Sequence, residues 1–460
     1  MTKSLDMRTE EINRLRFKRG FDSKKVFTVM MVSLIVAAGY IGWFWYNLMY
    51  AGPVELYHRT WQAARDNFFD KDSLKDWKRF EHCFDKKIRN DNDAVEYANK
   101  MLATLNDPYT VLHGRAELQR IAKLQNEKFV GIGVFLEQVK STLNGKRLLA
   151  VKGLMPDGPA LKAGVKRGDE ILSINGQQGT DLTIEKLREI VAERENRPTS
   201  VVVKRGALRK TLVLKPSTVV RKDVELQPSD KRFAHIVVRN FMKKDVADRT
   251  MQLLEKTAHR PAIILDLRNN PGGSVDECLK LATAFISEGP LVTLKVREVG
   301  GAHTFHSYSA RPDYLELKKV DMTGKIIERK ELPRFRPIAD KRPLAVLINE
   351  GSASASEMLA AALRDNRRAV LVGSRSFGKG VAQAGIPIAN GTVLTVTCVH
   401  YLTPSGRFLG TGKAGYEGVK STTSSEGILP DFVVTEPHID SSAYSDKPLA
   451  AALRILQAQG

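Results

Sequence analysis

Cysteine is scarce in this 460-residue chain. The three cysteines, Cys83, Cys278 and Cys398, are far apart, odd in number and form no C-x-x-C pair. This spacing excludes a disulfide framework and the paired-cysteine pattern of a zinc finger. No signature of a nucleophilic cysteine surrounds any of them, so cysteine chemistry does not explain the function.

Acidic residues are too few to balance the basic ones, and the formal net charge is +20. Such a charge fits a nucleic-acid partner, an anionic membrane surface or solubility alone. The sequence contains no RNA-binding signature and no basic helix of the recognition type. The basic residues are spread along the chain, with a local excess between 329 and 342. Without a motif, charge does not establish nucleic-acid binding, and we expect none.

Charged residues are also missing from the 25-residue run 26–50. A transmembrane helix needs about 20 apolar residues, and the preceding residues 1–25 carry eight Lys or Arg against four acids. A cleaved signal peptide is the alternative, but its apolar region is usually shorter. The sequence therefore predicts a basic cytoplasmic tail over 1–25 and one anchor over 26–50. The protein would be a single-pass inner-membrane protein with a periplasmic or otherwise extracytoplasmic catalytic body.

The rest of the chain divides into three regions by its patterns. Apolar residues at helical spacing predict a helical region over 52–127. Residues 128–217 alternate short strands and helices around glycine turns. Apolar strands alternate with helices over 218–460, which predicts a layered α/β core. The polar, basic stretch 299–340 does not fit that pattern and is interpreted as an insertion or flap.

Two segments of the α/β region contain candidate catalytic residues. Ser354 lies between a predicted strand and an apolar helix, where a helix N-terminus stabilises an oxyanion. Ser354 and Glu357 also fit a capping box, which would give the serine a purely structural role. Lys379 lies between two glycines after another predicted strand. It would act as a base only if burial lowered its pKa, and otherwise it is a solvated charge.

A glycine pair, Gly272 and Gly273, ends the segment DLRNNPGG before a predicted helix. Backbone N–H groups there could complete an oxyanion hole or hold a phosphate. Neither a G-x-G-x-x-G pattern nor a G-K-[ST] motif occurs at this turn, which argues against a nucleotide.

These segments together resemble the C-terminal processing peptidases. The run PALKAGVKRGDEILSINGQ at 159–177 is similar to a bacterial PDZ domain. It is followed in order by DLRNNPGG, NEGSASASEMLAAAL and GSRSFGKGVAQ, and DPYT, YLTPSGR and GILPD also match. The resemblance covers nearly all of the chain after residue 52 and implies an α/β core of the crotonase/caseinolytic-protease type with a PDZ domain. The stretch 299–340 is longer than in most family members.

The resemblance also implies roles for individual residues. Ser354, the middle serine of SASAS, matches the nucleophile, Lys379 the general base, and Gln383 a residue that assists the lysine. The oxyanion hole would use the backbone of Ala355 and of either Gly272 or Gly273. The carboxylate-binding loop of the PDZ domain corresponds to Val130, Gly131, Ile132, Gly133 and Val134.

The sequence therefore predicts a membrane-anchored serine endopeptidase that captures apolar C-terminal tails of protein substrates and uses a Ser–Lys dyad. A metal ion or cofactor is not required by this mechanism. A homodimer or an adaptor protein remains open as a further partner. Alternatives are a catalytically inactive PDZ scaffold, an acyl-CoA enzyme of the crotonase type, and a Ser-His-Asp triad that would use His235, His259 or His400.

Overall fold

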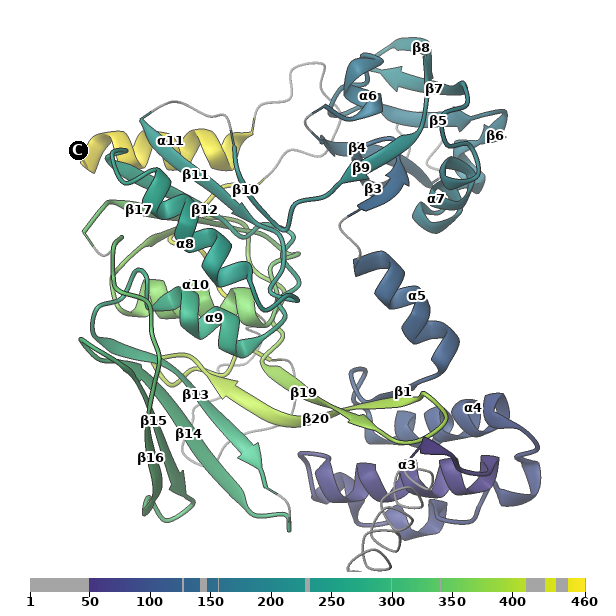
Figure 1. Cartoon of the computed structure of the whole chain (residues 1–460), viewed down its shortest axis with the longest axis vertical. Coiled ribbons are helices and arrows are strands. Elements are labelled where there is room, and N and C mark those ends of the chain that lie inside the picture. The colour runs from purple at the N-terminus through teal and green to yellow at the C-terminus, as the bar shows by residue number, and fades with distance from the viewer. Residues whose placement is uncertain are drawn as a thin grey trace, which may run out of the picture. The chain divides into compact units, whose positions relative to one another are not determined.

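The structure, a computed structural model, describes residues 49–125, 128–140, 147–155, 157–227, 232–298, 300–339, 341–410, 427–435 and 446–459. These residues form two compact units. The first contains 49–65, 73–118 and 385–395, and the second contains the other described residues. Figure 1 labels most of the helices and strands.

The first unit is mainly helical. Its elements are α3 (Pro53–Asn67), α4 (Asp91–Leu102), strand β1 (Val111–His113) and the short 3-10 helices η1 (Asp72–Leu74, partly in this unit), η2 (Trp77–Phe80), η3 (Asp85–Lys87) and η4 (Ala103–Leu105). Asn90 caps α4 by accepting a hydrogen bond from the Asp93 N–H at 3.0 Å. Leu56, Tyr57 and Met101 are fully buried, so α3 and α4 each have a buried face. Helix α5 (Arg115–Gln125) leads from this unit into the second.

Residues 128–220 form a small β-rich part of the second unit. An antiparallel sheet contains β3 (Val134–Lys140), β4 (Arg147–Leu154), β5 (Glu170–Ile174), β6 (Gln177–Gln178), β7 (Thr199–Arg205) and β8 (Leu208–Leu214). Helices α6 (Pro159–Lys162) and α7 (Ile184–Ala192) and the 3-10 helix η5 (Gly179–Asp181) complete it. Strands β2 (Lys128–Gly131) and β9 (Ser217–Val220) pair with each other, so the chain enters and leaves this part side by side.

The α/β core is built on a six-stranded sheet. Its order is β10 (Val224–Leu226), β11 (Phe233–Val238), β12 (Ala262–Asp266), β17 (Leu344–Ile348), β18 (Val370–Gly373) and β21 (Phe432–Val433), with all neighbours parallel except β10 and β11. Every residue of β12 and β17 is buried, as expected for central parallel strands covered on both faces.

Alternate residues of these strands pack on opposite layers of helices (Figure 1). Ile263, Leu265 and Val346 pack with α8 (Val246–Lys256), α9 (Val275–Ala282) and α10 (Ala355–Asp365). Ile264 and Leu347 face α11 (Lys447–Gln459) through Ala452 and Leu456. Because β12 and β17 are neighbours, the turns that follow their C-terminal ends lie beside each other.

A second antiparallel sheet contains β13 (Gly289–Arg297), β14 (His303–Ala310), β15 (Leu315–Asp321) and β16 (Ile326–Leu332). In the second unit β13 also pairs with the C-terminal part of β20 (Val393–Leu402), which pairs with β19 (Val381–Pro387). In the first unit the N-terminal end of β20 pairs with β1. Much of the stretch 299–340, interpreted from sequence as an insertion or flap, thus consists of β14, β15 and β16.

The expected transmembrane helix, and the single-pass membrane localisation inferred from it, are contradicted. In the part of the chain that the structure describes, no helix is both long and apolar enough to cross a membrane. The longest described helix, α3, has 15 residues and would span about 22 Å, whereas a hydrocarbon core is about 30 Å thick. The segment 26–50 on which the prediction was based lies outside the described residues except for Met49 and Tyr50.

Candidate active site

Ser354 lies at the turn between β17 and α10, immediately before the first helical residue. Its φ of 56° and ψ of −119° are unusual for a residue other than glycine. Such strained conformations cost about 1–3 kcal/mol and cluster at functional sites. Ser354 is 8% exposed, at the N-terminus of a helix that is buried over its first nine residues. The side chain is therefore close to the helix N–H groups that attract negative charge.

The two flanking serines have structural contacts. The Ser352 hydroxyl donates to the Leu267 carbonyl at 2.8 Å, and the Ser356 hydroxyl donates to the carbonyls of Asn270 and Ala353 at 2.8 and 2.7 Å. Both serines are fully buried. Their hydrogen bonds to Leu267 and Asn270 connect the Ser354 turn to the turn after β12.

The carboxylate of Glu357 joins the Ser354 turn to the Lys379 loop. Oε2 accepts hydrogen bonds from the backbone N–H groups of Ser354 at 2.8 Å and Lys379 at 2.9 Å. Oε1 accepts from the Ser376 hydroxyl at 2.6 Å and the Gly378 N–H at 2.8 Å. Burial raises the pKa of this carboxyl, while the four donated hydrogen bonds act in the opposite direction. The capping interaction foreseen from sequence is present, and the same carboxylate also positions Lys379.

Tyr401 on β20 connects the same two segments from another side. Its hydroxyl donates to the Lys379 carbonyl and, at 3.4 Å, to the Ser354 carbonyl. Its own backbone N–H donates to the Gly380 carbonyl at 2.9 Å. The side chain is fully buried, so these bonds are shielded from water. Ser354 and Lys379, 25 residues apart in the sequence, are therefore held together through Glu357 and Tyr401.

The glycine pair lies beside the Ser354 turn. A Cβ atom on Gly272, whose φ is +94°, would be 2.8 Å from Ser354 Cβ and 2.9 Å from Ala355 N. A Cβ atom on Gly273 would be 2.3 Å from the backbone carbon of Phe241. The N–H of Gly272 already donates to Asn270 Oδ1 at 2.8 Å. Because the Gly272 N–H is already engaged, we propose Gly273 as the partner of Ala355 in an oxyanion hole.

An ionic network surrounds the start of the turn that follows β12. Arg268 donates to both oxygens of Asp266 and to both oxygens of Asp446, which precedes α11. His235 contacts Asp266 at 3.3 Å. Burial alone would raise the pKa of Asp266, but the charge of Arg268 and the hydrogen bonds from His235 and Arg268 hold that pKa well below its usual range.

The remaining candidates from sequence have other contacts. The Gln383 amide on β19 donates to Thr397 Oγ1 at 3.1 Å. His235 contacts Asp266, and His400 stacks on Phe69 with ring centroids 3.6 Å apart. These contacts do not involve Ser354, and burial together with Lys295 lowers the pKa of His400 to about 4.

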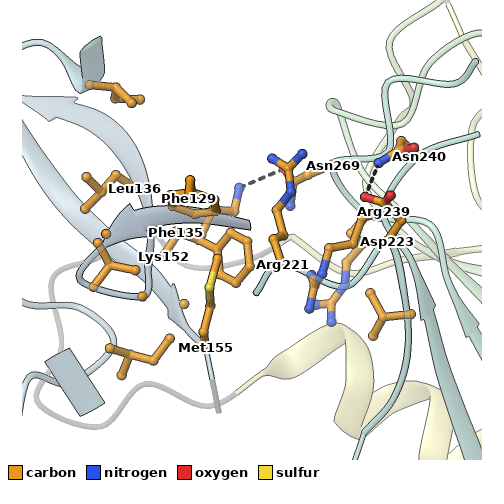
Figure 2. Close-up of a pocket in the computed structure, with 18 of the residues that line it drawn as sticks. Phe129, Phe135, Leu136, Lys152, Met155, Arg221, Asp223, Arg239, Asn240 and Asn269 are labelled. Atoms are coloured by element: carbon orange, nitrogen blue, oxygen red, sulfur yellow. Dashed lines mark hydrogen bonds between the residues drawn. The ribbon is translucent and has the colours of Figure 1, made fainter. Parts of the chain in front are cut away.

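The glycine loop 130–134 lines a cavity of about 990 Å³ within the second unit. Figure 2 shows the labelled apolar side chains on one side of the cavity and Arg221 and Arg239, with Asp223 and Asn240, on the other. Phe129, Phe135, Leu136 and Met155 supply the apolar part. Lys152 donates to Asn269 Oδ1 at 3.2 Å, and the Arg239 guanidinium lies 4.7 Å from the centre of the Phe135 ring. The lining thus contains both apolar surface and basic groups.

Sequence reasoning missed three residues of this site. Glu357 was interpreted only as a capping partner, and Tyr401 and Asn270 were given no role. Asn270 is fully buried, and its carbonyl accepts from the Ala353 N–H at 2.9 Å. All three lie in the motif segments, so the sequence signal was their position, whereas their roles depend on contacts across the fold.

Comparison with known proteins shows which families the chain is similar to. Residues 232–434 match the family model of peptidase family S41, and residues 151–205 match a PDZ domain model. A probable CtpA-like serine protease of Staphylococcus haemolyticus is 26% identical over 81% of this chain and 67% of its own length. A second, of Staphylococcus aureus strain MRSA252, is also 26% identical, over 96% of this chain and 77% of its own length. A putative S41 protease from Bacteroides fragilis, 14% identical, superposes with a TM-score of 0.54 over 87% of this chain and 97% of that one, which supports the fold.

Proposed function

Because the chain belongs to the C-terminal processing peptidases, serine-type proteases of peptidase family S41 with a PDZ domain, we propose that it cleaves proteins with a Ser354–Lys379 dyad. In this proposal the PDZ domain captures the C-terminal tail of a protein substrate. The substrate is then cut near or upstream of its own C-terminus.

The proposed chemistry follows from the two side chains. Neutral Lys379 Nζ takes the proton of Ser354 Oγ while that oxygen attacks the carbonyl carbon of the substrate. The N–H groups of Ala355 and Gly273 stabilise the negative charge that develops on the carbonyl oxygen. The Lys379 ammonium then gives its proton to the leaving amine as the C–N bond breaks. Lys379 then takes a proton from water, which attacks the acyl carbon, and Lys379 returns that proton to Ser354 Oγ as the ester bond breaks.

The observation that carries the proposal is the shared acceptor Glu357 Oε2. It holds the backbone N–H groups of Ser354 and Lys379 at 2.8 and 2.9 Å from one atom. A serine that served only as a helix cap would not need a lysine loop fixed to the same carboxylate. Tyr401, which donates to the carbonyls of both residues, gives the same support from a third element.

Capture of the substrate tail is argued from the glycine loop. A peptide added beside β3 would extend the sheet with backbone hydrogen bonds, and the N–H groups of residues 131–134 would receive its terminal carboxylate. Apolar residues near the tail would contact Phe135, Leu136 and Met155 in the cavity. The basic residues of the lining, among them Lys152 and Arg239, favour an anionic end group.

The test is a cleavage assay with the full chain. An unfolded protein that ends in apolar residues is incubated with wild type, Ser354→Ala and Ser352→Ala, and the products are mapped by mass spectrometry. We expect cuts with wild type and none with Ser354→Ala. Ser352→Ala, which loses only a structural hydroxyl, should retain cleavage in proportion to its folded fraction. Tail binding without any cleavage by wild type would instead favour an inactive PDZ scaffold.

A further inference from the structure

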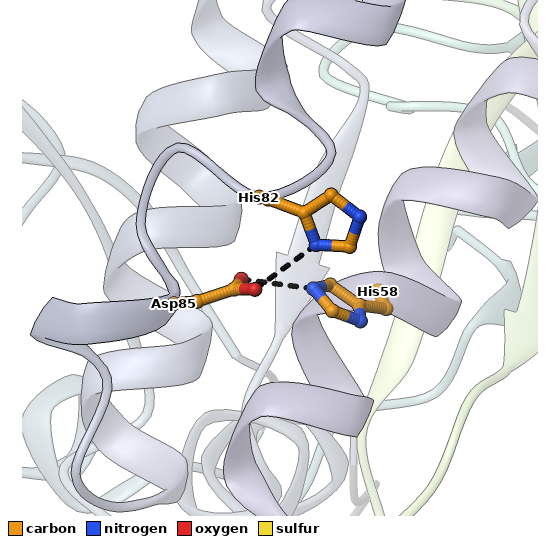
Figure 3. Close-up of side chains that lie close together, drawn as sticks. All are labelled: His58, His82 and Asp85. Atoms are coloured by element: carbon orange, nitrogen blue, oxygen red, sulfur yellow. Dashed lines mark hydrogen bonds and ion pairs between the residues drawn. The ribbon is translucent and has the colours of Figure 1, made fainter.

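Three metal-ligating side chains converge in the first unit, and the peptidase mechanism uses none of them (Figure 3). His58 lies on α3, whereas His82 and Asp85 lie on the segment between η2 and the end of η3. His58 Nε2 is 2.8 Å from Asp85 Oδ1, and His82 Nδ1 is 3.0 Å from Asp85 Oδ2. The three ligand atoms all lie within 4.8 Å of one another.

This arrangement is close to what a zinc ion requires. Ligand atoms about 2.0–2.2 Å from a tetrahedral Zn²⁺ are roughly 3.3 Å apart. The two nitrogens are slightly closer than that value to Asp85, each to a different carboxylate oxygen, so the side chains must rotate apart to admit an ion. The imidazole rings are nearly perpendicular, with centroids 4.8 Å apart, so they approach the carboxylate from different directions.

The type of ligand narrows the choice of ion. Two imidazole nitrogens with one carboxylate suit Zn²⁺ and its late transition-metal neighbours, whereas Ca²⁺ and Mg²⁺ prefer oxygen ligands throughout. The side chains of His58 and Asp85 are 27% and 29% exposed, and that of His82 is 68% exposed. Water can therefore reach the remaining coordination position.

The backbone that carries these ligands is held in place by buried contacts. Tyr57, which precedes His58, is fully buried, donates its hydroxyl to the Phe80 carbonyl and packs edge-on against Phe84. The indole of Trp61 donates to the Trp77 carbonyl at 3.0 Å, and the indole of Trp77 donates to the Trp61 carbonyl at 3.1 Å. Helix α3 and the 77–85 segment are thus fixed to each other on both sides of the cluster. An ion would find its ligands already positioned.

We propose that His58, His82 and Asp85 bind one divalent late transition-metal ion of the Zn²⁺ class, which joins α3 to the 82–85 turn. The ion has a structural role in the first unit. The Zn²⁺-bound chain resists unfolding of that unit more than the metal-free chain does, because the ion binds the folded form.

The test uses the full chain without a polyhistidine tag, first treated with a chelator and then titrated with Zn²⁺ in a calorimeter. We expect one saturable site per chain. His58→Gln and His82→Gln should each weaken it at least tenfold, and Zn²⁺ should raise the melting temperature of wild type but not of either variant. Co²⁺ in place of Zn²⁺ should give visible absorption bands that His82→Gln removes.

Two matched controls separate this site from other ligands. Cys83→Ser removes an exposed thiol next to His82, and His113→Gln removes a histidine of the same unit whose ring lies 3.4 Å from Glu117. Both should bind Zn²⁺ within about twofold of wild type. The proposal is overturned if wild type shows no saturable binding, or if binding survives in the His58→Gln/His82→Gln double variant. All these variants should keep their peptidase activity, so this outcome is independent of the catalytic proposal.

Discussion

At the residue scale, Glu357 is the acceptor on which both halves of the proposed dyad depend. Glu357→Gln would direct an NH₂ group at donors that now point to a carboxylate oxygen, which leaves buried N–H groups unsatisfied. We predict that kcat falls at least about tenfold while KM changes little, because Ser354 and Lys379 lose their alignment. Steady-state kinetics on a peptide substrate measures this split.

The matched control for that variant is Glu350→Gln. Glu350 lies on the same turn, but its carboxylate is exposed and accepts from the Ser374 hydroxyl. We expect it to retain wild-type kcat. A Glu357→Gln enzyme with normal kcat would remove Glu357 from the catalytic account.

Asp266 makes a second residue-scale prediction, which concerns stability in acid. Its folded-state pKa is lowered, so the folded protein keeps the carboxylate ionised where the unfolded chain takes up a proton. This stabilisation is present above the unfolded pKa of about 4 and is lost as the pH falls below it. As the pH falls below 4, the free energy of unfolding of Asp266→Asn should decrease less steeply than that of wild type. The two slopes should differ by up to about 1.4 kcal/mol per pH unit.

Urea unfolding at several pH values between 4 and 2.5 measures this slope. Asp313→Asn, a substitution at an exposed position in the connection from β14 to β15, should leave the slope as in wild type. Equal slopes for wild type and Asp266→Asn would contradict the assigned role of the Arg268 network.

At the scale of elements, the turn after β12 must contain glycine because it approaches the Ser354 turn. An alanine at 272 would place its Cβ 2.7 Å from the Ala353 carbonyl oxygen and 2.8 Å from Ser354 Cβ. We predict that Gly272→Ala displaces Ser354, the proposed nucleophile, and lowers kcat/KM at least about a hundredfold.

Gly324, in the turn between β15 and β16, provides the control for that substitution. Its φ of +86° is similar to that of Gly272, but a Cβ there would meet nothing within 4 Å. Gly324→Ala should therefore cost about 1–2 kcal/mol of stability and leave activity unchanged. If the two variants lose activity equally, the backbone conformation rather than the contact with Ser354 is responsible.

Some of these elements can be predicted from the sequence, and others cannot, for physical reasons. Ser354 and Lys379 stand in motifs that can be recognised at a fixed spacing, and the apolar runs of β12 and β17 indicate buried strands. By contrast, β16 is exposed or partly exposed at every residue, so it has no apolar alternation that would predict a strand. The roles of Glu357 and Tyr401 depend on hydrogen bonds between distant segments.

At the scale of the whole molecule, the chain enters and leaves the PDZ domain through one β-ribbon, formed by β2 and β9. Gly131 on β2 pairs with Ser217 on β9, so residues 132–216 can be replaced by a short glycine-rich turn. We predict that this variant folds but no longer cleaves folded substrates that carry an apolar tail. Circular dichroism checks the fold, and a competition between apolar-tailed and charged-tailed substrates measures selectivity. Unchanged tail selectivity would show that another surface recognises the tail.

The central claim is that Lys379 acts as a neutral base for Ser354, and Lys379→Arg tests it most directly. Arginine keeps the positive charge and most of the length but cannot give up its proton. Cleavage rates are measured for this variant beside Lys379→Ala, Ser354→Ala and the Ser354→Ala/Lys379→Ala double variant. We predict that all four are reduced to the same background, because residues of one catalytic unit are not additive. Near-normal turnover by a folded Lys379→Arg enzyme would contradict the account.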